Sequence, residues 1–249
     1  MSPIVIGCIA FLCVFGAALA GMALRSRLPG HHLEAESRDA IKLATAIIGT
    51  LSALALGLLI ASAKRSFDDA GMERRTSAAR VLLLDRVLAH YGPEAQSLRV
   101  ALRKAVEARL RAEQDDGRDA PVAEGFDLEQ IQEELRALTP QTEAQRLLRA
   151  RAIQVSGDIA EARWLRTETE VGGFPTPFLA VLILWFALLF ASFGLLAPGN
   201  GTVVLTLLAC ALSVSLALVL VIDMDHPYLG FIRISDVPFR TTLERLGRP

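Results

Sequence analysis

The sequence predicts an all-α polytopic membrane protein, with four transmembrane helices and a charged helical domain between the second and the third. Two observations lead to this fold class. Three long runs contain no charged side chain, at residues 3–24, 43–63 and 171–222. In contrast, most of the charged residues of the 249-residue chain stand between the second and third of these runs. The chain therefore alternates membrane segments with one polar block.

The lengths of the charge-free runs predict the number of spans. A hydrocarbon core about 30 Å thick takes roughly 20 helical residues. The first two runs therefore each supply one span. The third run is long enough for two, and the Pro-Gly-Asn-Gly sequence at residues 198–201 predicts a tight turn inside it. This turn divides the run into spans at residues 177–197 and 202–222.

The first span has an alternative interpretation as a signal peptide, because Ala18-Leu19-Ala20 is typical of a cleavage site. Against this, no basic residue precedes the apolar run, and the run is longer than the roughly 7–15 apolar residues of a signal core. We therefore expect a retained span.

The distribution of basic residues predicts the sidedness of the protein. Four spans place both termini and the charged domain on one face. Ten basic residues flank the spans on that face, and four flank them on the other, at Arg25, Arg27, Arg38 and Lys42. Because flanking Lys and Arg are enriched on the cytoplasmic side, we expect the termini and the charged domain to be cytoplasmic.

We divide the chain into four segments. They are residues 1–63 with the first two transmembrane helices, residues 64–173 with the charged helical cytoplasmic domain, residues 174–222 with the last two transmembrane helices, and residues 223–249 with a cytoplasmic C-terminal segment. Apolar residues in the charged domain recur in narrow stripes at helical spacing. Such stripes are typical of a helical bundle or a coiled coil.

The C-terminal segment contains one short amphipathic pattern. Ser235 or Asp236 can cap a helix that begins near Pro238, and Gly247 ends it. One side of this helix is apolar and consists of Phe239, Leu243 and Leu246. We expect it to lie in the membrane interface.

Motifs for catalysis do not occur in the sequence. It has no nucleophile elbow, P-loop, dinucleotide-binding fingerprint or HExxH pair, so we expect neither an enzyme nor a cofactor. The net charge of −1 gives no electrostatic footprint for nucleic acid. No ionisable acid, base or histidine lies within a span, which argues against a proton pump. Asp223 and Asp225, at the end of the fourth span, are weak candidates for a metal site, and otherwise a polar helix end.

The second span carries two neighbouring strips of small and polar residues. The first, called the small strip, has helical spacing and consists of Ala46, Thr50, Ala53, Gly57 and Ala61. Small side chains let helices approach closely, so this strip predicts helix–helix packing. The second strip contains Thr45, Gly49 and Ser52. Because small side chains and hydroxyl groups leave room for ions or water, a pore wall is the alternative to packing.

Several segments resemble the bestrophin-like family of bacterial membrane proteins. They are residues 28–33 (LPGHHL), 57–64 (GLLIASAK), 190–195 (FASFGL), 197–198 (AP), 210–213 (CALS) and 225–235 (DHPYLGFIRIS). These segments cover both ends of the chain and leave the charged domain weakly matched.

The resemblance implies kinship with bestrophins, which are pentameric ion channels whose second membrane helix lines a central pore. It therefore implies a homopentamer in the bacterial inner membrane. Carried over to this sequence, it makes one strip of the second span the candidate pore wall. This strip, called the polar strip, consists of Thr45, Gly49, Ser52, Leu56 and Leu59.

The sequence departs from the bestrophin pattern in two places, the acidic cluster after the last span and the neck of the pore. Animal bestrophins bind calcium through an acidic cluster after the last span, and only Asp223 and Asp225 stand at that place here. Bestrophin pores also have a neck rich in bulky apolar and aromatic residues, whereas the stripe of the second span here is small. The expected pore mouth is formed by Lys64 and Arg65, which attract anions. Asp68 and Asp69, one turn further on, oppose this attraction.

From these observations we expect an ion-conducting homo-oligomer in the lipid bilayer. Two alternatives stay open. One is a membrane-anchored interaction or scaffold protein without transport, whose charged helical domain docks a partner. The other is a proton-channel subunit of the flagellar-stator type, which shares the topology but no sequence motif.

Overall fold

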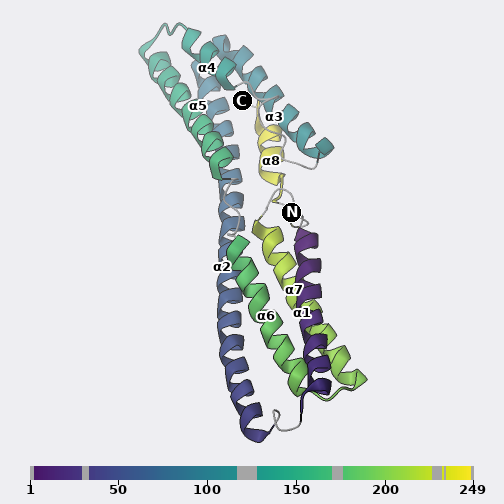
Figure 1. Cartoon of the computed structure of the whole chain (residues 1–249). Helices are drawn as coiled ribbons and strands as arrows, with labels where there is room; N and C mark the ends of the chain where they lie inside the picture. Colours follow the sequence, from purple (N-terminus) through teal and green to yellow (C-terminus); the bar gives the residue numbers. More distant parts are fainter. Residues whose placement is uncertain are drawn as a thin grey trace. The chain divides into compact units, whose positions relative to one another are not determined.

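The computed structural model describes residues 3–29, 34–116, 128–169, 176–225, 232 and 234–247. Within these ranges the chain is helical and contains no strand, which confirms the all-α fold class (Figure 1). The helices are α1 (Pro3–Arg27), α2 (Ala35–Tyr91), the short 3₁₀ helix η2 (Pro93–Ala95), α3 (Gln96–Asp116), α4 (Leu128–Ala137), α5 (Glu143–Thr169), α6 (Thr176–Leu196), α7 (Gly201–Asp225) and α8 (Val237–Arg245).

Four helices of the described chain are long and apolar enough to cross a membrane, as the sequence predicts. They are α1, the first part of α2, α6 and α7. The predicted tight turn separates the last two, because α6 ends at Leu196 and α7 begins at Gly201. Asn200 caps α7, since its Oδ1 atom accepts a hydrogen bond of 3.0 Å from the backbone N–H of Val203. The chain is therefore a multi-pass membrane protein.

The chain forms two compact units. The membrane unit comprises Met1–Ser66 and Gly173–His226, and the helical unit comprises Phe67–Gly172 and Pro227–Pro249. The boundary falls inside α2, which stays helical from Ala35 to Tyr91. Because nothing in the local sequence stops the helix after the second span, one helix contributes to both units.

Helix α1 packs lengthwise on α6 and α7 in the membrane unit. Its contact face is a stripe of small residues at helical spacing, all of them buried, namely Gly7, Ala10, Val14, Ala18 and Gly21. A Cβ atom added at Gly21 would collide with the carbonyl oxygen of Ala191, and one added at Gly194 would collide with that of Ala18. Only a hydrogen atom fits at these two positions, so the backbones of α1 and α6 meet directly.

The end of α1 also holds the end of α6. Arg25 Nη1 donates hydrogen bonds to the carbonyl oxygens of Leu196, at 3.1 Å, and Ala197. These carbonyl groups follow the last turn of α6 and have no partner within their own helix. A cation at a helix C-terminus also interacts favourably with the helix dipole. The sequence identified Arg25 only as a flanking charge and did not indicate this contact.

Helix α2 joins the membrane unit mainly through side chains. Leu59 and Ala63 are buried in the apolar core of the unit. Gly49 lies opposite Leu189 of α6, whose Cδ1 atom would be 3.2 Å from a Cβ added at the glycine. Among the described residues, α2 makes no backbone approach as extensive as that of α1 to α6.

The helical unit has its own apolar core, to which α2, α3, α4, α5 and α8 contribute. The stripes predicted from the sequence supply it. The largest fully buried side chains include Leu84, Leu88, Leu98, Leu102 and Leu135. Burying a leucine side chain stabilises a fold by about 1.5–3 kcal/mol, so these residues are the main reason why the charged segment folds into a bundle.

A buried ion pair lies beside this core. Asp85 is fully buried, and its two carboxylate oxygens accept hydrogen bonds from Arg99 Nε at 2.8 Å and Arg99 Nη2 at 3.2 Å. The hydrogen bond to Asp85 raises the pKa of Arg99 above its ordinary value and outweighs the opposing effect of burial. Because the pKa of Arg99 is raised, its charge contributes this stabilisation without loss up to the ordinary pKa of arginine. The charge of Arg99 is therefore constant in the physiological pH range.

Helix α8 differs from the expected interfacial helix. Its apolar side is buried in the helical unit, where Phe239 is 2% exposed and Leu246 is 1% exposed. The guanidinium carbon of Arg109 lies 4.2 Å from the centre of the Phe239 ring, and Thr242 Oγ1 donates a hydrogen bond of 3.4 Å to the carbonyl of Ala78. An amphipathic pattern predicts that the apolar side of a helix is buried, but it does not predict whether protein or lipid buries it. In α8 the apolar side is buried by protein.

Both ends of α8 are tied to α2. Asp236, just before the helix, does not cap it with its side chain but forms an ion pair of 2.8 Å with Arg74, which is 4% exposed. Ser235 Oγ accepts a hydrogen bond of 3.3 Å from the N–H of Val237. After the helix, the N–H of Gly247 donates a hydrogen bond of 3.4 Å to Asp85 Oδ2. Residues 234–247 are thus an integral part of the helical unit.

We expect Gly21→Ala to destabilise the membrane unit by about 1–3 kcal/mol, because the added methyl group overlaps a backbone carbonyl of α6. Thermal unfolding of the purified protein in detergent measures the loss. Gly16→Ala, in the same helix, is the matched control, since a Cβ there meets nothing within 4 Å. Equal melting temperatures for the two variants would contradict the close pairing of α1 and α6.

Phe239→Ala is expected to destabilise the helical unit by about 3–5 kcal/mol, because it leaves a cavity in the core. Limited trypsin digestion of the intact protein detects the release of α8 as faster cleavage after Arg240 and Arg245. Val237→Ala is the control, because Val237 is 61% exposed at the start of the same helix. If α8 lay in the membrane interface instead, the two variants would be digested at similar rates.

Candidate pore-forming helix

The polar strip, which is the predicted pore wall, lies inside the membrane unit. Thr45, Ser52 and Leu59 are 6%, 1% and 3% exposed, and Gly49 and Leu56 are half-buried. In the single chain these residues therefore face the other membrane helices. Helical periodicity explains their common orientation, because positions seven apart differ by two nearly complete turns.

The small strip, predicted to pack against another helix, is exposed in the single chain. All five of its members are exposed, Ala46, Thr50, Ala53, Gly57 and Ala61. Thr50 Oγ1 donates a hydrogen bond of 2.9 Å to the carbonyl of Ala46, which satisfies the hydroxyl group without outside help. A Cβ added at Gly57 would meet nothing within 4 Å. This strip is therefore open to lipid, to water or to another copy of the chain.

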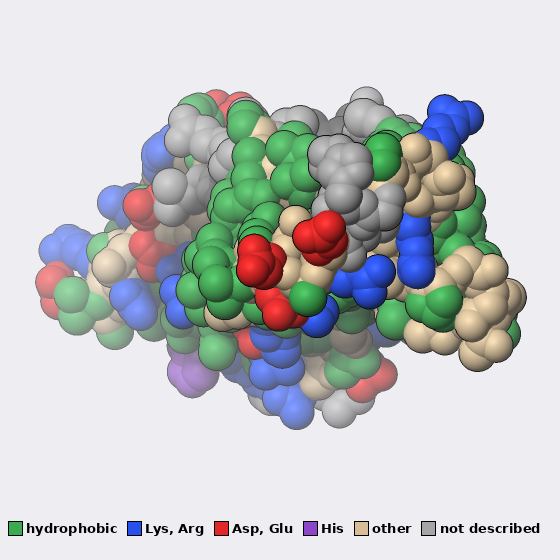
Figure 2. Space-filling view, turned by 60° about the horizontal axis from the view of Figure 1, so that its bottom comes forward, with side chains coloured by type: hydrophobic (Ala, Val, Ile, Leu, Met, Phe, Trp, Pro, Cys, Tyr) green, Lys and Arg blue, Asp and Glu red, His purple; other side chains and the backbone are tan. Residues whose placement is uncertain are grey.

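A third strip of α2 consists of large aliphatic residues and lies next to the small strip on the helix surface. The leucine strip consists of Leu43, Ile47, Leu51, Leu54 and Leu58, all of them exposed. The sequence analysis did not single it out, although its members have the same helical spacing as the small strip. Figure 2 shows hydrophobic side chains gathered in large areas of the visible face, as expected for helices in contact with lipid or with one another.

These orientations bear on the pore assignment. A pore between copies of a subunit is lined by side chains that the single subunit leaves exposed. The small strip meets this condition, and the polar strip does not. The assignment of Thr45, Gly49, Ser52, Leu56 and Leu59 to the pore wall stays a prediction, and it requires α2 to turn about its axis when the channel assembles or opens.

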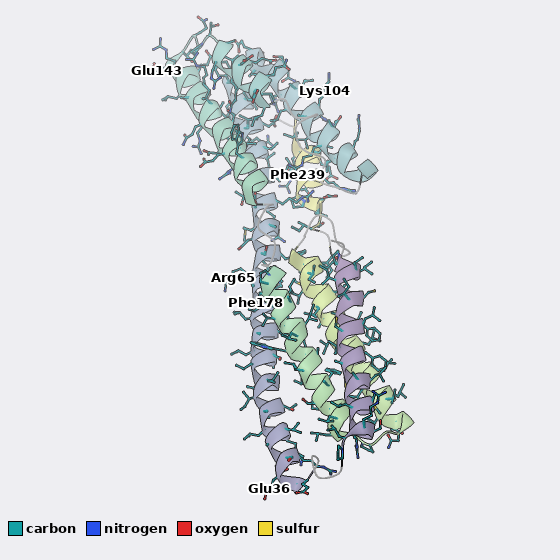
Figure 3. The ribbon with its side chains drawn as sticks, viewed as in Figure 1. Glu36, Arg65, Lys104, Glu143, Phe178 and Phe239 are labelled. Carbon is teal, nitrogen blue, oxygen red and sulfur yellow. The ribbon has the colours of Figure 1, made fainter. Side chains whose placement is uncertain are left out.

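The expected pore mouth lies at the C-terminal end of the membrane part of α2. Lys64 and Arg65 are exposed there, as are Asp68 and Asp69 one turn further along the helix. Glu36 and Arg65, labelled in Figure 3, mark the two ends of the membrane part of α2. Since both signs of charge occur within two turns of one helix, the local field at this mouth is mixed.

The end of α7 holds the weak metal candidates. Asp223 is 2% exposed, and the side chain of Asp225 lies outside the described residues. Within the described ranges no group of three or more His, Cys, Asp or Glu side chains is placed to hold a metal ion. The weak assignment of Asp223 and Asp225 to a metal site, and the alternative of a polar helix end, both stay predictions.

Comparison with known proteins identifies the family of the chain. A family model, the bestrophin-like domain, matches residues 12–239. The chain belongs to the bestrophin-like family. The match runs from α1 into α8, so it includes the four membrane helices and also the charged domain that the quoted sequence segments left weakly matched. No curated protein and no solved structure matches the chain in the corresponding comparisons.

One functional feature of the bestrophin-like chain escaped the sequence analysis, namely which small stripe is used for packing inside the subunit. The stripe of α1 that contains Gly7 and Gly21 packs there, and the small strip of α2 does not. A signal was available, because the small residues of α1 recur at the same helical spacing. Periodicity alone could not rank the two stripes.

Proposed function

We propose that this bestrophin-like protein is an ion channel, formed by several copies of the chain around a central axis with α2 beside the pore. The observation that carries the proposal is the family match over residues 12–239, because bestrophins are ion channels. Kinship with bestrophins supports five copies. The basic residues that flank the spans support cytoplasmic termini and a cytoplasmic helical unit in a bacterial inner membrane.

The packing of one membrane unit supports a path between copies rather than through one copy. The interior of the unit is filled by apolar side chains, among them Leu182, Phe186, Phe190 and Leu218. A dry, close-packed interior of this kind excludes ions. An ion path therefore needs a surface of the subunit, and α2 leaves the small strip and the leucine strip exposed.

In a ring of subunits, the two exposed strips of α2 are suited to two different surroundings, the central axis and a neighbouring subunit or lipid. The small strip, with the hydroxyl group of Thr50 and the open position at Gly57, leaves room beside an axis. The leucine strip offers large apolar side chains to a neighbouring subunit or to lipid. Lys64 and Arg65 concentrate anions at the inner mouth, and Asp68 and Asp69 weaken this effect.

A scaffold function is the second candidate, and one feature of the helical unit favours it. Several large apolar side chains of this unit are exposed, notably Leu147 and Trp164 of α5, which are 66% and 72% exposed. Exposed aromatic residues are common anchors of protein–protein interfaces. A monomeric mass in detergent, together with one stoichiometric partner in a pull-down, would favour this function over a channel.

The mass of the purified protein in detergent tests the assembly. We expect a homo-oligomer, and five copies by kinship with bestrophins. Native mass spectrometry gives the number of subunits directly. A monomer at every protein concentration would contradict the proposal, because the apolar interior of one membrane unit provides no ion path.

Ion flux tests the place of α2 beside the pore. Gly57→Leu is expected to lower the conductance of the reconstituted protein by about tenfold or more, because the added side chain takes up space between the copies of α2 around the axis. Gly16→Leu on α1 is the matched control, since both glycines are exposed and a Cβ at either meets nothing within 4 Å. Planar bilayers with gradients of several salts provide the measurement. If the unmodified protein conducts under none of them, the channel proposal is wrong.

A further inference from the structure

The hydroxyl group of Ser52 differs from several other hydroxyl groups of the described membrane helices, and only Ser215 of α7 shares its burial without a hydrogen-bond partner there. Thr45, Thr50 and Ser213 each donate a hydrogen bond of 2.7–2.9 Å to the carbonyl four residues earlier. Ser52 is 1% exposed, and its Oγ atom has no hydrogen-bond partner in the described part of the chain. A buried hydroxyl without a partner disfavours a conformation by about tenfold relative to one in which it is solvated.

Four of the five members of the polar strip are each followed directly by a member of the small strip along α2. Thr45 precedes Ala46, and likewise Gly49 precedes Thr50 and Ser52 precedes Ala53 in the sequence. Neighbouring residues of an α-helix are about 100° apart around its axis. A turn of about 100° therefore brings the polar strip to the place that the small strip occupies in the structure.

The same turn preserves an apolar interior. The residues that would then face inward are those that precede the members of the polar strip, namely Ala44, Ile48, Leu51, Ala55 and Leu58. All five are apolar, and Ile48 and Ala55 are already half-buried at the margin of the contact. The turn thus replaces two hydroxyl groups inside the membrane unit by aliphatic side chains, which suits a dry interior better.

The packing of α2 permits such a motion. Its contact with α6 at Gly49 is made by the end of the flexible Leu189 side chain, at 3.2 Å from an added Cβ, and not by backbone. The contact of α1 with α6 at Gly21, in contrast, is backbone against backbone. Gly71, a little beyond the boundary between the two units, has no neighbour within 4 Å of an added Cβ. Its backbone freedom offers a place where α2 can twist.

We propose that α2 turns by about 100° about its own axis between a closed state, which the structure shows, and an open state in which Ser52 and the polar strip line the pore. This inference rests on the proposed channel function and adds its gating motion. In the closed state the small strip faces the axis, and its single hydroxyl group, on Thr50, donates its hydrogen to the carbonyl of Ala46, so the pore is largely apolar, which impedes wetting. In the open state Ser52 Oγ hydrogen-bonds to pore water, so opening removes the unpartnered hydroxyl from the interior.

Cross-linking α2 to α6 tests the motion directly. In a background in which Cys8, Cys13 and Cys210 are replaced by alanine, Gly49→Cys and Leu189→Cys are joined by a short bifunctional thiol reagent. We expect the cross-link to abolish conductance in planar bilayers and its reduction to restore it. Each single-cysteine variant, treated in the same way, is the control. Unchanged conductance of the fully cross-linked protein would overturn the turning motion and leave the channel proposal intact.

Thiol labelling in the same background provides a readout that does not depend on current. Ser52→Cys in reconstituted protein is expected to react with a charged, water-soluble methanethiosulfonate, because the thiol meets water in the open state. Ser215→Cys on α7 is the matched control and is expected to stay unmodified, because Ser215 is 4% exposed and likewise has no partner for its Oγ atom in the described chain. Equal protection of the two thiols in protein that conducts would overturn the inference. If no variant and no unmodified protein conducts, the channel proposal fails first.

Discussion

The direct backbone contact between α1 and α6 is the constraint on which the membrane unit depends. In lipid no hydrophobic force draws apolar helices together, so close approach and hydrogen bonding have to supply the attraction. Gly21 and Gly194 provide the approach, and Arg25 provides the hydrogen bonds by holding the last carbonyl groups of α6. With α7 packed on the other part of the α1 surface, these three helices form a well-fitted group. Helix α2 is added to it mainly through side chains, and it leaves two strips of its surface exposed.

The difference between the packing of α1 and the packing of α2 is relevant to the proposed function. A helix that is locked by backbone contacts cannot change the face that it presents, whereas one held by the ends of leucine side chains can turn. The unpartnered hydroxyl of Ser52 makes the observed orientation of α2 less favourable than its apolar packing implies. In the helical unit, by contrast, α2 carries buried leucines, the ion pair of Asp85 with Arg99 and both attachments of α8. One helix is thus loosely held in the membrane unit and firmly held in the helical unit.

The C-terminal helix shows how far an amphipathic pattern carries. Phe239, Leu243 and Leu246 lie on one side of α8, as the sequence predicts, and Gly247 ends the helix with a positive φ of 78°. The same pattern suits a membrane surface and a protein groove equally well. Long-range partners decide between them, and here the ring of Phe239 meets Arg109 while Asp236 pairs with Arg74. Because these partners are far away in the sequence, no local signal identifies them.

The sequence by itself determined the all-α class, the four spans, the turn near Asn200 and the helical stripes, because each depends on the length or the period of a local pattern. It also carried the resemblance to the family that the chain belongs to. Only the tertiary structure decided which small-residue stripe packs inside the subunit and which face of α2 is left exposed. Thr45 and Ala46 are neighbours in the sequence, yet one is buried and the other is exposed. The physical reason is that the spacing of residues defines the faces of a helix but does not say which face packs against another helix. That depends on the tertiary structure, here on the positions at which a glycine lets the backbone of a second helix approach closely.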